Sequence, residues 1–189
     1  MAWKIPGTLL ECDRVDADKL EAQLTWFPTL GGFSMHHITE LTGLEAYTVQ
    51  NWVKRGFLAP PQNRRYTADQ LCRIILIHML KGVFPMDKIC RMLSFVNGKL
   101  DDTADDIIPD SKLYFMFVRL AARAKALDKD PETELDRELQ DYVEPYPGAE
   151  DRIRQVLKIM LTGYLACRMK QEAEEKLEKL LEGEMNYER

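Results

Sequence analysis

Between residues 34 and 58, apolar residues recur at the spacing of two short amphipathic helices. Ser34 is suited to cap the first helix, and the second is predicted from about Glu45 to Arg55. Gly43 stands where the chain must reverse between them, a place where positive φ is free of strain only for glycine. The residues predicted to face inward are Ile38, Leu41, Leu44, Val49, Trp52 and Val53.

A short connection, Pro60 to Tyr66, follows these helices and leads to two more. Two prolines make it stiff, and we predict a small β wing, a loop between two extended pieces, with Arg64 and Arg65 at its tip. Thr67 to Gln70 has the spacing of a capping box and opens a strongly apolar helix. That helix is predicted to close at Lys81-Gly82, and Pro85 opens the next one, which ends near Leu93.

The remaining segments also predict helices, with few signs of strand. A short helix is expected over residues 16–25, and residues 94–109 are expected to form a linker with turns. Helices follow over about 111–128 and 131–143, the second with Asp130 as its cap and Pro131 at its first position. A last helix is predicted over about 149–181. Its first half carries a broad apolar stripe, while its second half keeps only a thin apolar seam, typical of either a coiled-coil contact or a solvated extension.

The charges are unevenly distributed along the chain. The net charge is −5, yet residues 34–94 carry eight Lys/Arg and four Asp/Glu, whereas the segments before and after them are acidic. Phosphate attraction depends on the charge at the contact surface more than on the total. The four cysteines are scattered without a C-x-x-C pair, which favours reduced thiols. No membrane span and no secretory signal is expected, so we predict a cytoplasmic protein.

The outer face of the second helix carries side chains that can recognise DNA. These residues are Tyr47, Gln50, Asn51 and Lys54. Amide, hydroxyl and ammonium groups on one helix face can reach base edges and phosphates in the major groove. Arg64 and Arg65 would add guanidinium groups for phosphate or minor-groove contact. The six residues together form the predicted DNA-binding site.

This stretch resembles the DNA-binding domain of the MerR family of bacterial regulators. The resemblance rests on Glu40 to Leu44, Asn51-Trp52, Gly56 to Leu58, Arg64 to Thr67 and Lys81 to Val83. The whole chain also resembles an uncharacterised bacterial family that has such a domain on its N-terminal side. The resemblance implies a winged helix-turn-helix and transcription regulation. The chain departs from the MerR pattern in several features: Tyr47 stands where that family usually has arginine, the wing is short, a linker and two extra helices precede the long last helix, and cysteines placed for metal sensing are absent.

Other chemistry finds little support in the sequence. His36 and His37 are adjacent on a helix and point about 100° apart, which disfavours a shared metal ion. His78 lies on an apolar helix face, where a core histidine with one hydrogen bond is the expected role. No phosphate loop, nucleophile elbow or spaced metal-ligand set is present. We therefore expect no catalytic residues, no cofactor, no metal and no enzymatic activity.

The sequence thus predicts a mainly α protein in three parts. Residues 1–33 form an N-terminal helix and loop, residues 34–94 a winged helix-turn-helix domain, and residues 95–189 a helical dimerisation or effector domain. The expected function is sequence-specific binding of double-stranded DNA by a homodimer that regulates transcription. The helical domain could also hold a small-molecule effector. The alternative is a protein-interaction module that keeps the winged-helix fold without binding DNA.

Overall fold

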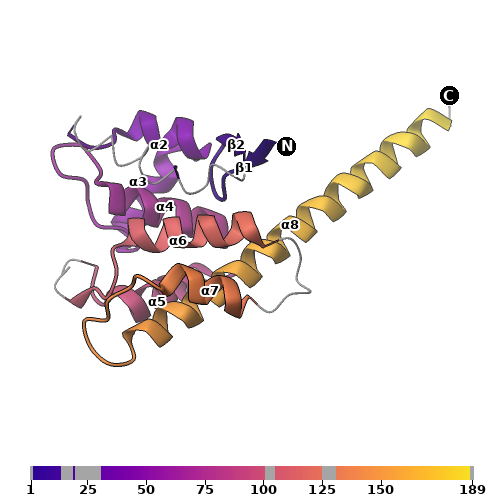
Figure 1. Ribbon diagram of the computed structural model, residues 1–189. Coiled ribbons are helices and arrows are strands. Elements are labelled where there is room, and N and C mark those ends of the chain that lie inside the picture. The colour runs from indigo at the N-terminus through magenta and orange to yellow at the C-terminus, as the bar shows by residue number, and fades with distance from the viewer. Residues whose placement is uncertain (1, 14–18, 20–30, 101–104, 125–130, 188–189) are drawn as a thin grey trace.

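The computed structural model describes residues 2–13, 19, 31–100, 105–124 and 131–187. Its strands are β1 (Ala2–Lys4) and β2 (Glu11–Asp13), and its helices are α2 (Met35–Thr42), α3 (Ala46–Lys54), α4 (Ala68–Leu80), α5 (Met86–Asn97), α6 (Asp110–Arg123), α7 (Glu132–Leu139) and α8 (Ala149–Tyr187). The mainly α class is confirmed. In Figure 1, α4 and α6 lie side by side, with α2 and α3 on one side and α5, α7 and the start of α8 on the other.

The sheet lies at the N-terminus, where the sequence pattern indicated no strands. β1 and β2 pair antiparallel, with Trp3 opposite Cys12. Trp3 and Ile5 are buried, so the hairpin contributes to the core. Gly7 adopts φ 74°, and a Cβ at this position would lie 2.7 Å from a side-chain carbon of Ile75, which explains a glycine at the hairpin turn. The helix expected over residues 16–25 lies outside the described residues.

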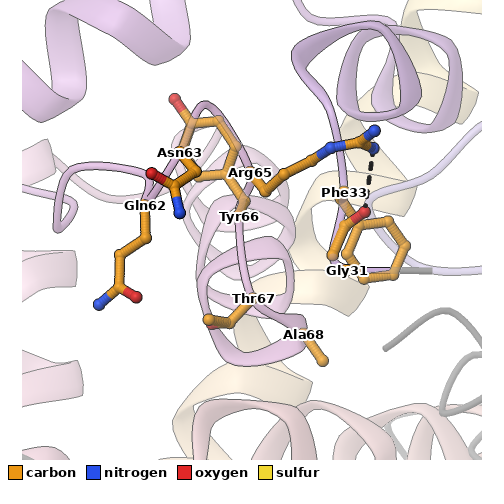
Figure 2. Close-up of a pocket in the computed structure, with 9 residues that line it drawn as sticks. Gly31, Phe33, Gln62, Asn63, Arg65, Tyr66, Thr67 and Ala68 are labelled. Carbon is orange, nitrogen blue, oxygen red and sulfur yellow. Dashed lines mark hydrogen bonds between the residues drawn. The ribbon is translucent and has the colours of Figure 1, made fainter. Parts of the chain in front are cut away.

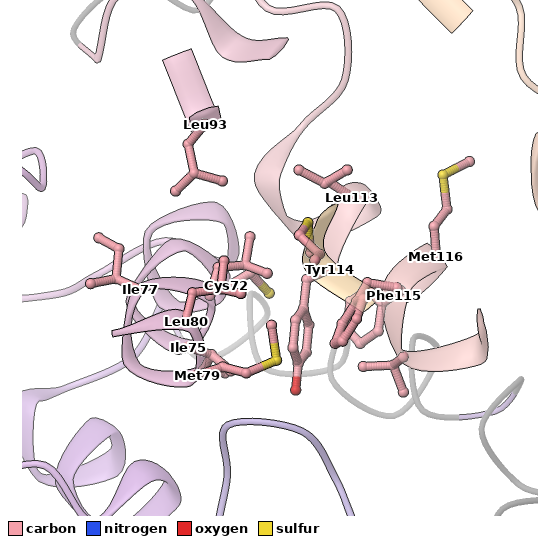
Figure 3. Packing of buried hydrophobic residues seen from close by; sticks show 14 of the residues in the cluster. Cys72, Ile75, Ile77, Met79, Leu80, Leu93, Leu113, Tyr114, Phe115 and Met116 are labelled. Carbon is pink, nitrogen blue, oxygen red and sulfur yellow. The ribbon is translucent and has the colours of Figure 1, made fainter. Parts of the chain in front are cut away.

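Helix α4 is the centre of the core and packs most extensively against α6. Every residue from Leu71 to Ile77 is buried, so α4 is covered on all sides. Figure 3 shows side chains of α4 meeting Leu113 and Tyr114 of α6, and the Tyr114 hydroxyl donates a 2.9 Å hydrogen bond to the Pro6 carbonyl. Full burial of one large apolar side chain stabilises a fold by about 1.5–3 kcal/mol. The α4–α6 contact is therefore a major source of stability.

A buried polar cluster joins α4, α5 and α6. Arg73 Nη1 donates to Asp110 Oδ2 over 3.1 Å, and Asn97 Nδ2 donates to Asp110 Oδ1 over 2.9 Å. Burial raises the pKa of Asp110, partly against the effect of Arg73. Asn97 is the last residue of α5, which therefore continues four residues beyond the predicted end at Leu93. The predicted linker over 94–109 is wrong in its first turn, because this turn of α5 has buried partners that are distant in sequence.

The other helix ends differ modestly from prediction. α6 ends at Arg123, five residues before the predicted end, and its C-cap is Ala124. α7 has Pro131 as its N-cap, so the proline stands one position earlier than expected. The predicted cap Asp130 lies outside the described residues, as does the chain between Ala124 and Pro131.

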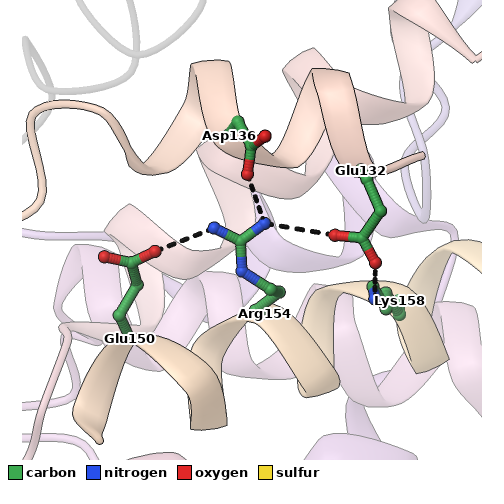
Figure 4. A network of polar contacts seen from close by, with 5 residues as sticks. All are labelled: Glu132, Asp136, Glu150, Arg154 and Lys158. Atoms are coloured by element: carbon green, nitrogen blue, oxygen red, sulfur yellow. Dashed lines mark hydrogen bonds and ion pairs between the residues drawn. The ribbon is translucent and has the colours of Figure 1, made fainter.

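Charged side chains clamp α7 to α8. Figure 4 shows the Arg154 guanidinium between Glu132 and Asp136 of α7 and Glu150 of α8, with contacts of 3.2, 2.6 and 2.8 Å. Lys158 also pairs with Glu132. These contacts are partly exposed and join one network, which contributes more than isolated surface pairs do. They fix the proximal turns of α8 beside α7.

Helix α8 has two dissimilar halves, as the sequence predicted. Apolar side chains between Ile153 and Tyr164 are buried except that of Ile159, whereas every described side chain from Arg168 to Glu182 is exposed. Figure 1 shows this distal half projecting away from the rest of the molecule. Although α8 has 39 residues, neither it nor any other described helix carries a stretch apolar enough to cross a bilayer.

Candidate functional site

Helices α2 and α3 contact one another and are joined by a three-residue turn, and we call this pair the helix-turn-helix unit. Ser34 caps α2 through a capping box in which His37 takes part, and the predicted positive φ of Gly43 is confirmed at 71°. Leu44, in the three-residue connection, is buried at 6% exposure. A three- or four-residue turn containing glycine is typical of helix-turn-helix motifs. The sequence pattern thus placed both the caps and the turn correctly.

The four residues predicted on the outer face of α3 are all exposed and lie on one side of the helix. They are Tyr47, Gln50, Asn51 and Lys54, which we call the α3 face. Their spacing of three, one and three residues matches one side of a helix with 3.6 residues per turn. Tyr47 is 70% exposed, an unusual position for a tyrosine that has no packing role. Val49 and Trp52, on the opposite side, are buried and hold α3 against the body.

The connection after α3 contains a tight turn at Gln62 to Arg65, the 62–65 turn. Gln62 and Arg65 form an antiparallel bridge, and Asn63 and Arg64 have φ of 48° and 61°. Two successive positive φ values are typical of a type I′ hairpin turn. The predicted wing is present only as isolated bridges, since the described residues here form no regular strand.

The two arginines of this turn have different surroundings. Both are exposed, but Arg65 Nη1 donates to the Gly32 carbonyl over 3.3 Å, whereas Arg64 is at the apex of the turn. Phe33 and Tyr66 form a second bridge that ties the turn to the start of α2. A cavity of about 330 Å³ lies beside the turn. Figure 2 shows its lining residues, with the Arg65 side chain directed toward Gly31 and Phe33. Arg65 therefore also stabilises the turn, a role that the sequence did not indicate.

Neighbouring charges change the predicted electrostatics. Arg73 was counted in the basic segment, yet it is buried against Asp110 and does not contribute to the surface. Arg55, which the sequence reading did not single out, is exposed, and its guanidinium lies 4.8 Å from the centre of the Phe57 ring. The sequence feature that could have identified Arg55 as a binding residue is its position directly after Lys54. Glu45, also exposed, is the N-cap of α3 without a side-chain capping bond.

The histidines have structural surroundings. His37 Nδ1 accepts a hydrogen bond from the Ser34 backbone in the capping box, and His36 pairs with Glu40 at 3.4 Å. Among the described residues, no three metal-ligating side chains cluster. His78 is largely buried, but its Nδ1 has no hydrogen-bond partner in the described part of the chain, so the expected hydrogen bond is absent at that atom. Burial, together with Lys81 and Lys4, lowers the pKa of His78 to about 4.

Residues 32–117 match the family model of a domain of unknown function, DUF1836. The chain is also similar to the uncharacterized protein YkrK of Bacillus subtilis (strain 168), with 27% identity over 82 residues. That match covers 41% of this chain and 35% of YkrK, so it spans about a third of the relative's length. No solved structure matches the chain.

These comparisons overturn one prediction. The resemblance to the MerR family is wrong, because the similarity found over this region is to a domain of unknown function. The short motifs behind that resemblance, such as a glycine turn and a capped helix, serve helix-turn-helix geometry in general and do not identify a family. The matched region begins beside Phe33 and ends at Phe117 within α6, so it contains the helix-turn-helix unit, the 62–65 turn and the buried Arg73–Asp110 pair.

Proposed function

We propose that this protein binds double-stranded DNA sequence-specifically through α3 and regulates transcription in the cytoplasm. The observation that carries the proposal is the α3 face: four exposed side chains able to form hydrogen bonds, on the second helix of a helix-turn-helix unit. In such motifs the second helix enters the major groove, where asparagine and glutamine pair with adenine edges. Asn51 and Gln50 would read bases, and Tyr47 and Lys54 would position the helix.

The 62–65 turn would act as a short wing. Arg64, exposed at its apex, and Arg65, exposed beside it, would contact phosphates or the minor groove. Arg55 adds a third exposed guanidinium at the end of α3. Phosphate contacts supply most of the sequence-independent affinity and make it dependent on salt. The proposal that the fold is a winged helix depends on this turn.

A homodimer would supply the second DNA-reading unit, since one small module buries little surface. The distal half of α8 is the candidate contact, because it leaves the body with apolar side chains exposed. Met169, Leu177, Leu180 and Leu181 are 60, 54, 60 and 51% exposed. Sedimentation of a Leu177→Gln, Leu180→Gln variant tests this contact. We expect it to be monomeric, while a Lys176→Gln, Lys179→Gln control remains dimeric.

The DNA proposal is tested by fluorescence anisotropy with random-sequence duplexes, followed by selection of preferred sequences. Affinity should fall steeply with salt, with a logarithmic slope near −0.9 per phosphate neutralised. Arg64→Ala with Arg65→Ala should weaken binding to all duplexes, whereas Asn51→Ala should relax preference at one base by about 1–3 kcal/mol. Arg137→Ala, an exposed arginine on α7, is the matched control and should change nothing.

Failure of a confirmed dimer to bind any duplex at low salt would refute the proposal. The alternative, a protein-interaction module, has one feature in its favour: the Glu45 carboxylate lies at the N-terminus of α3, where DNA phosphates would approach. If the α3 face binds another protein and not DNA, Asn51→Ala would change neither the affinity for DNA nor the sequence preference.

A further inference from the structure

A groove of about 1070 Å³ lies between the N-terminal hairpin, the end of α4 and the middle of α8. Its hairpin wall includes Trp3 and Lys4, the end of α4 contributes Lys81, and α8 contributes Tyr164 and Arg168. Small-molecule sites typically have about 300–1000 Å³, so this groove could hold a ligand of that class with room for water. It is separate from the α3 face, because no residue of that face lines it.

The walls of the groove combine positive charge with apolar surface, of which Leu9 is the most exposed part at 52%. Lys4, Lys81 and Arg168 all line it, and none of them forms an ion pair with a carboxylate in the described part of the chain. Asp13 is the one acidic residue among those described as lining it. The Arg168 guanidinium lies 5.9 Å from the centre of the Tyr164 ring. Clefts lined by one sign of charge with apolar walls concentrate the electric field and favour a ligand of opposite sign.

His78 lies beside two of these cations in the groove. It also lines the groove, and its pKa is lowered to about 4 by burial first and then by Lys81 and Lys4. Two ammonium groups on different elements therefore act on the same imidazole, which stays neutral at pH 7. The neutral imidazole adds a hydrogen-bonding group to the groove, and the positive charge comes from the lysines and Arg168.

We propose that this groove binds a small amphipathic anion, an organic molecule with an aromatic or aliphatic body and an acidic group. The body would lie against the exposed Leu9 side chain, and the acidic group would face Lys4, Lys81 and Arg168. Apolar groups that leave water and anions that accept hydrogen bonds from cations both gain from this arrangement. The proposal does not depend on DNA binding.

The hairpin wall also touches the helix-turn-helix unit. Leu9 donates from its backbone to the Leu41 carbonyl over 2.8 Å, and a Cβ at Gly43 would lie 3.2 Å from the Leu9 side chain. Thr42, the last residue of α2, lines the groove itself. A ligand in the groove would therefore contact the same hairpin that holds the end of α2.

The test uses two fluorescent probes that differ only in charge. They are 8-anilinonaphthalene-1-sulfonate, an aromatic anion, and N-phenyl-1-naphthylamine, its neutral counterpart. We expect the full-length protein to bind the anion with a measurable Kd and the neutral probe at least about tenfold more weakly, as a charge-assisted contact predicts. Lys4→Gln with Lys81→Gln should weaken anion binding by about tenfold or more.

Lys88→Gln is the matched control, because Lys88 is exposed on α5 and does not line the groove. It should leave the Kd unchanged. The thermal midpoint shows whether each variant is folded, and Arg168→Gln, on a different helix, gives a second removal of charge. Equal affinity for both probes, or equal loss with Lys88→Gln and with the groove variants, would overturn the proposal, as would absence of binding.

Discussion

Replacing Arg73 by methionine should destabilise the protein far more than removing a surface charge. The side chains of Arg73 and Asp110 are 7% and 10% exposed, and their polar atoms lie 3.1 Å apart. Methionine retains the apolar stem of arginine, so the principal loss is the charge beside Asp110. Removing one partner of a buried ion pair costs about 3–5 kcal/mol, because the other charge remains buried without compensation.

The structure favours the lower end of that range, near 3 kcal/mol. Asn97 still donates to the Asp110 carboxylate, and the contact from Arg73 Nε to the Phe57 carbonyl is weak at 3.5 Å. For a chain of 189 residues this corresponds to a fall of about 10 °C in the midpoint of thermal unfolding. Urea denaturation followed by far-ultraviolet circular dichroism measures the free energy directly.

A double variant separates charge burial from packing. Arg73→Met with Asp110→Leu replaces both partners by apolar groups, and such replacements are often close to neutral. We therefore expect the double variant to recover part of the loss caused by Arg73→Met, because the buried Asn97 amide loses its acceptor when Asp110 is replaced. Lys170→Met, which removes one end of an exposed pair with Glu174 on α8, is the control and should not shift the midpoint measurably.

The cost of Arg73→Met should also depend on pH. Burial raises the pKa of Asp110, and loss of the neighbouring guanidinium should raise it further. The folded variant would then hold a proton more tightly than the unfolded chain, so its stability is retained at low pH and lost as pH rises through the folded-state pKa. A cost at pH 7 below about 1 kcal/mol, or one independent of pH, would contradict the buried-charge argument.

Two further predictions concern local features. Burial, reinforced by Asp110 and Asp105, raises the pKa of Asp106 to about 6, so this carboxyl favours folding when protonated and opposes it above pH 6. Asp106→Asn should therefore stabilise the protein by about 1 kcal/mol at pH 8, after allowance for solvent screening, and by nothing below pH 4, as urea titrations can measure. Gly43 and Gly56 have φ of 71° and 73°, but only at Gly43 would a Cβ meet another side chain. Replacement of either glycine by alanine should lower the free energy of unfolding by about 1 kcal/mol, because of backbone strain. Gly43→Ala should lower it further, because the new Cβ would meet the Leu9 side chain. Equal free energies of unfolding for the two variants would refute this contact.

Local signals in the sequence predicted most helices and their caps. Ser34, Gly43 and the Thr67–Gln70 capping box act through atoms within four residues of one another, so their effect is visible in the sequence. The N-terminal hairpin was missed because its strands have three residues each, too few for a clear alternation. Its position depends on contacts such as Tyr114 to Pro6, across 108 residues.

The candidate site, like the fold, could be predicted from the sequence only where the deciding contacts are local. The α3 face could be predicted from helical spacing, because the positions of the apolar residues on a helix determine which side is buried and which is exposed. Arg73 was misjudged as a surface cation, since its partner Asp110 is 37 residues away. The groove was invisible for the same reason: Trp3, Lys81 and Arg168 meet only once the hairpin, α4 and α8 are packed.

The end of α4 contacts both the helix-turn-helix unit and the projecting helix. Lys81 extends its ammonium group to within 5.9 Å of the centre of the Trp52 ring, in the buried side of α3. The next residue, Gly82, lies so close to α8 that a Cβ there would be 2.9 Å from the Cys167 sulfur. Two consecutive residues therefore contact α3 and α8, and both line the groove. A molecule bound there would touch both the residue at the end of α4 that contacts α3 and the one that contacts α8.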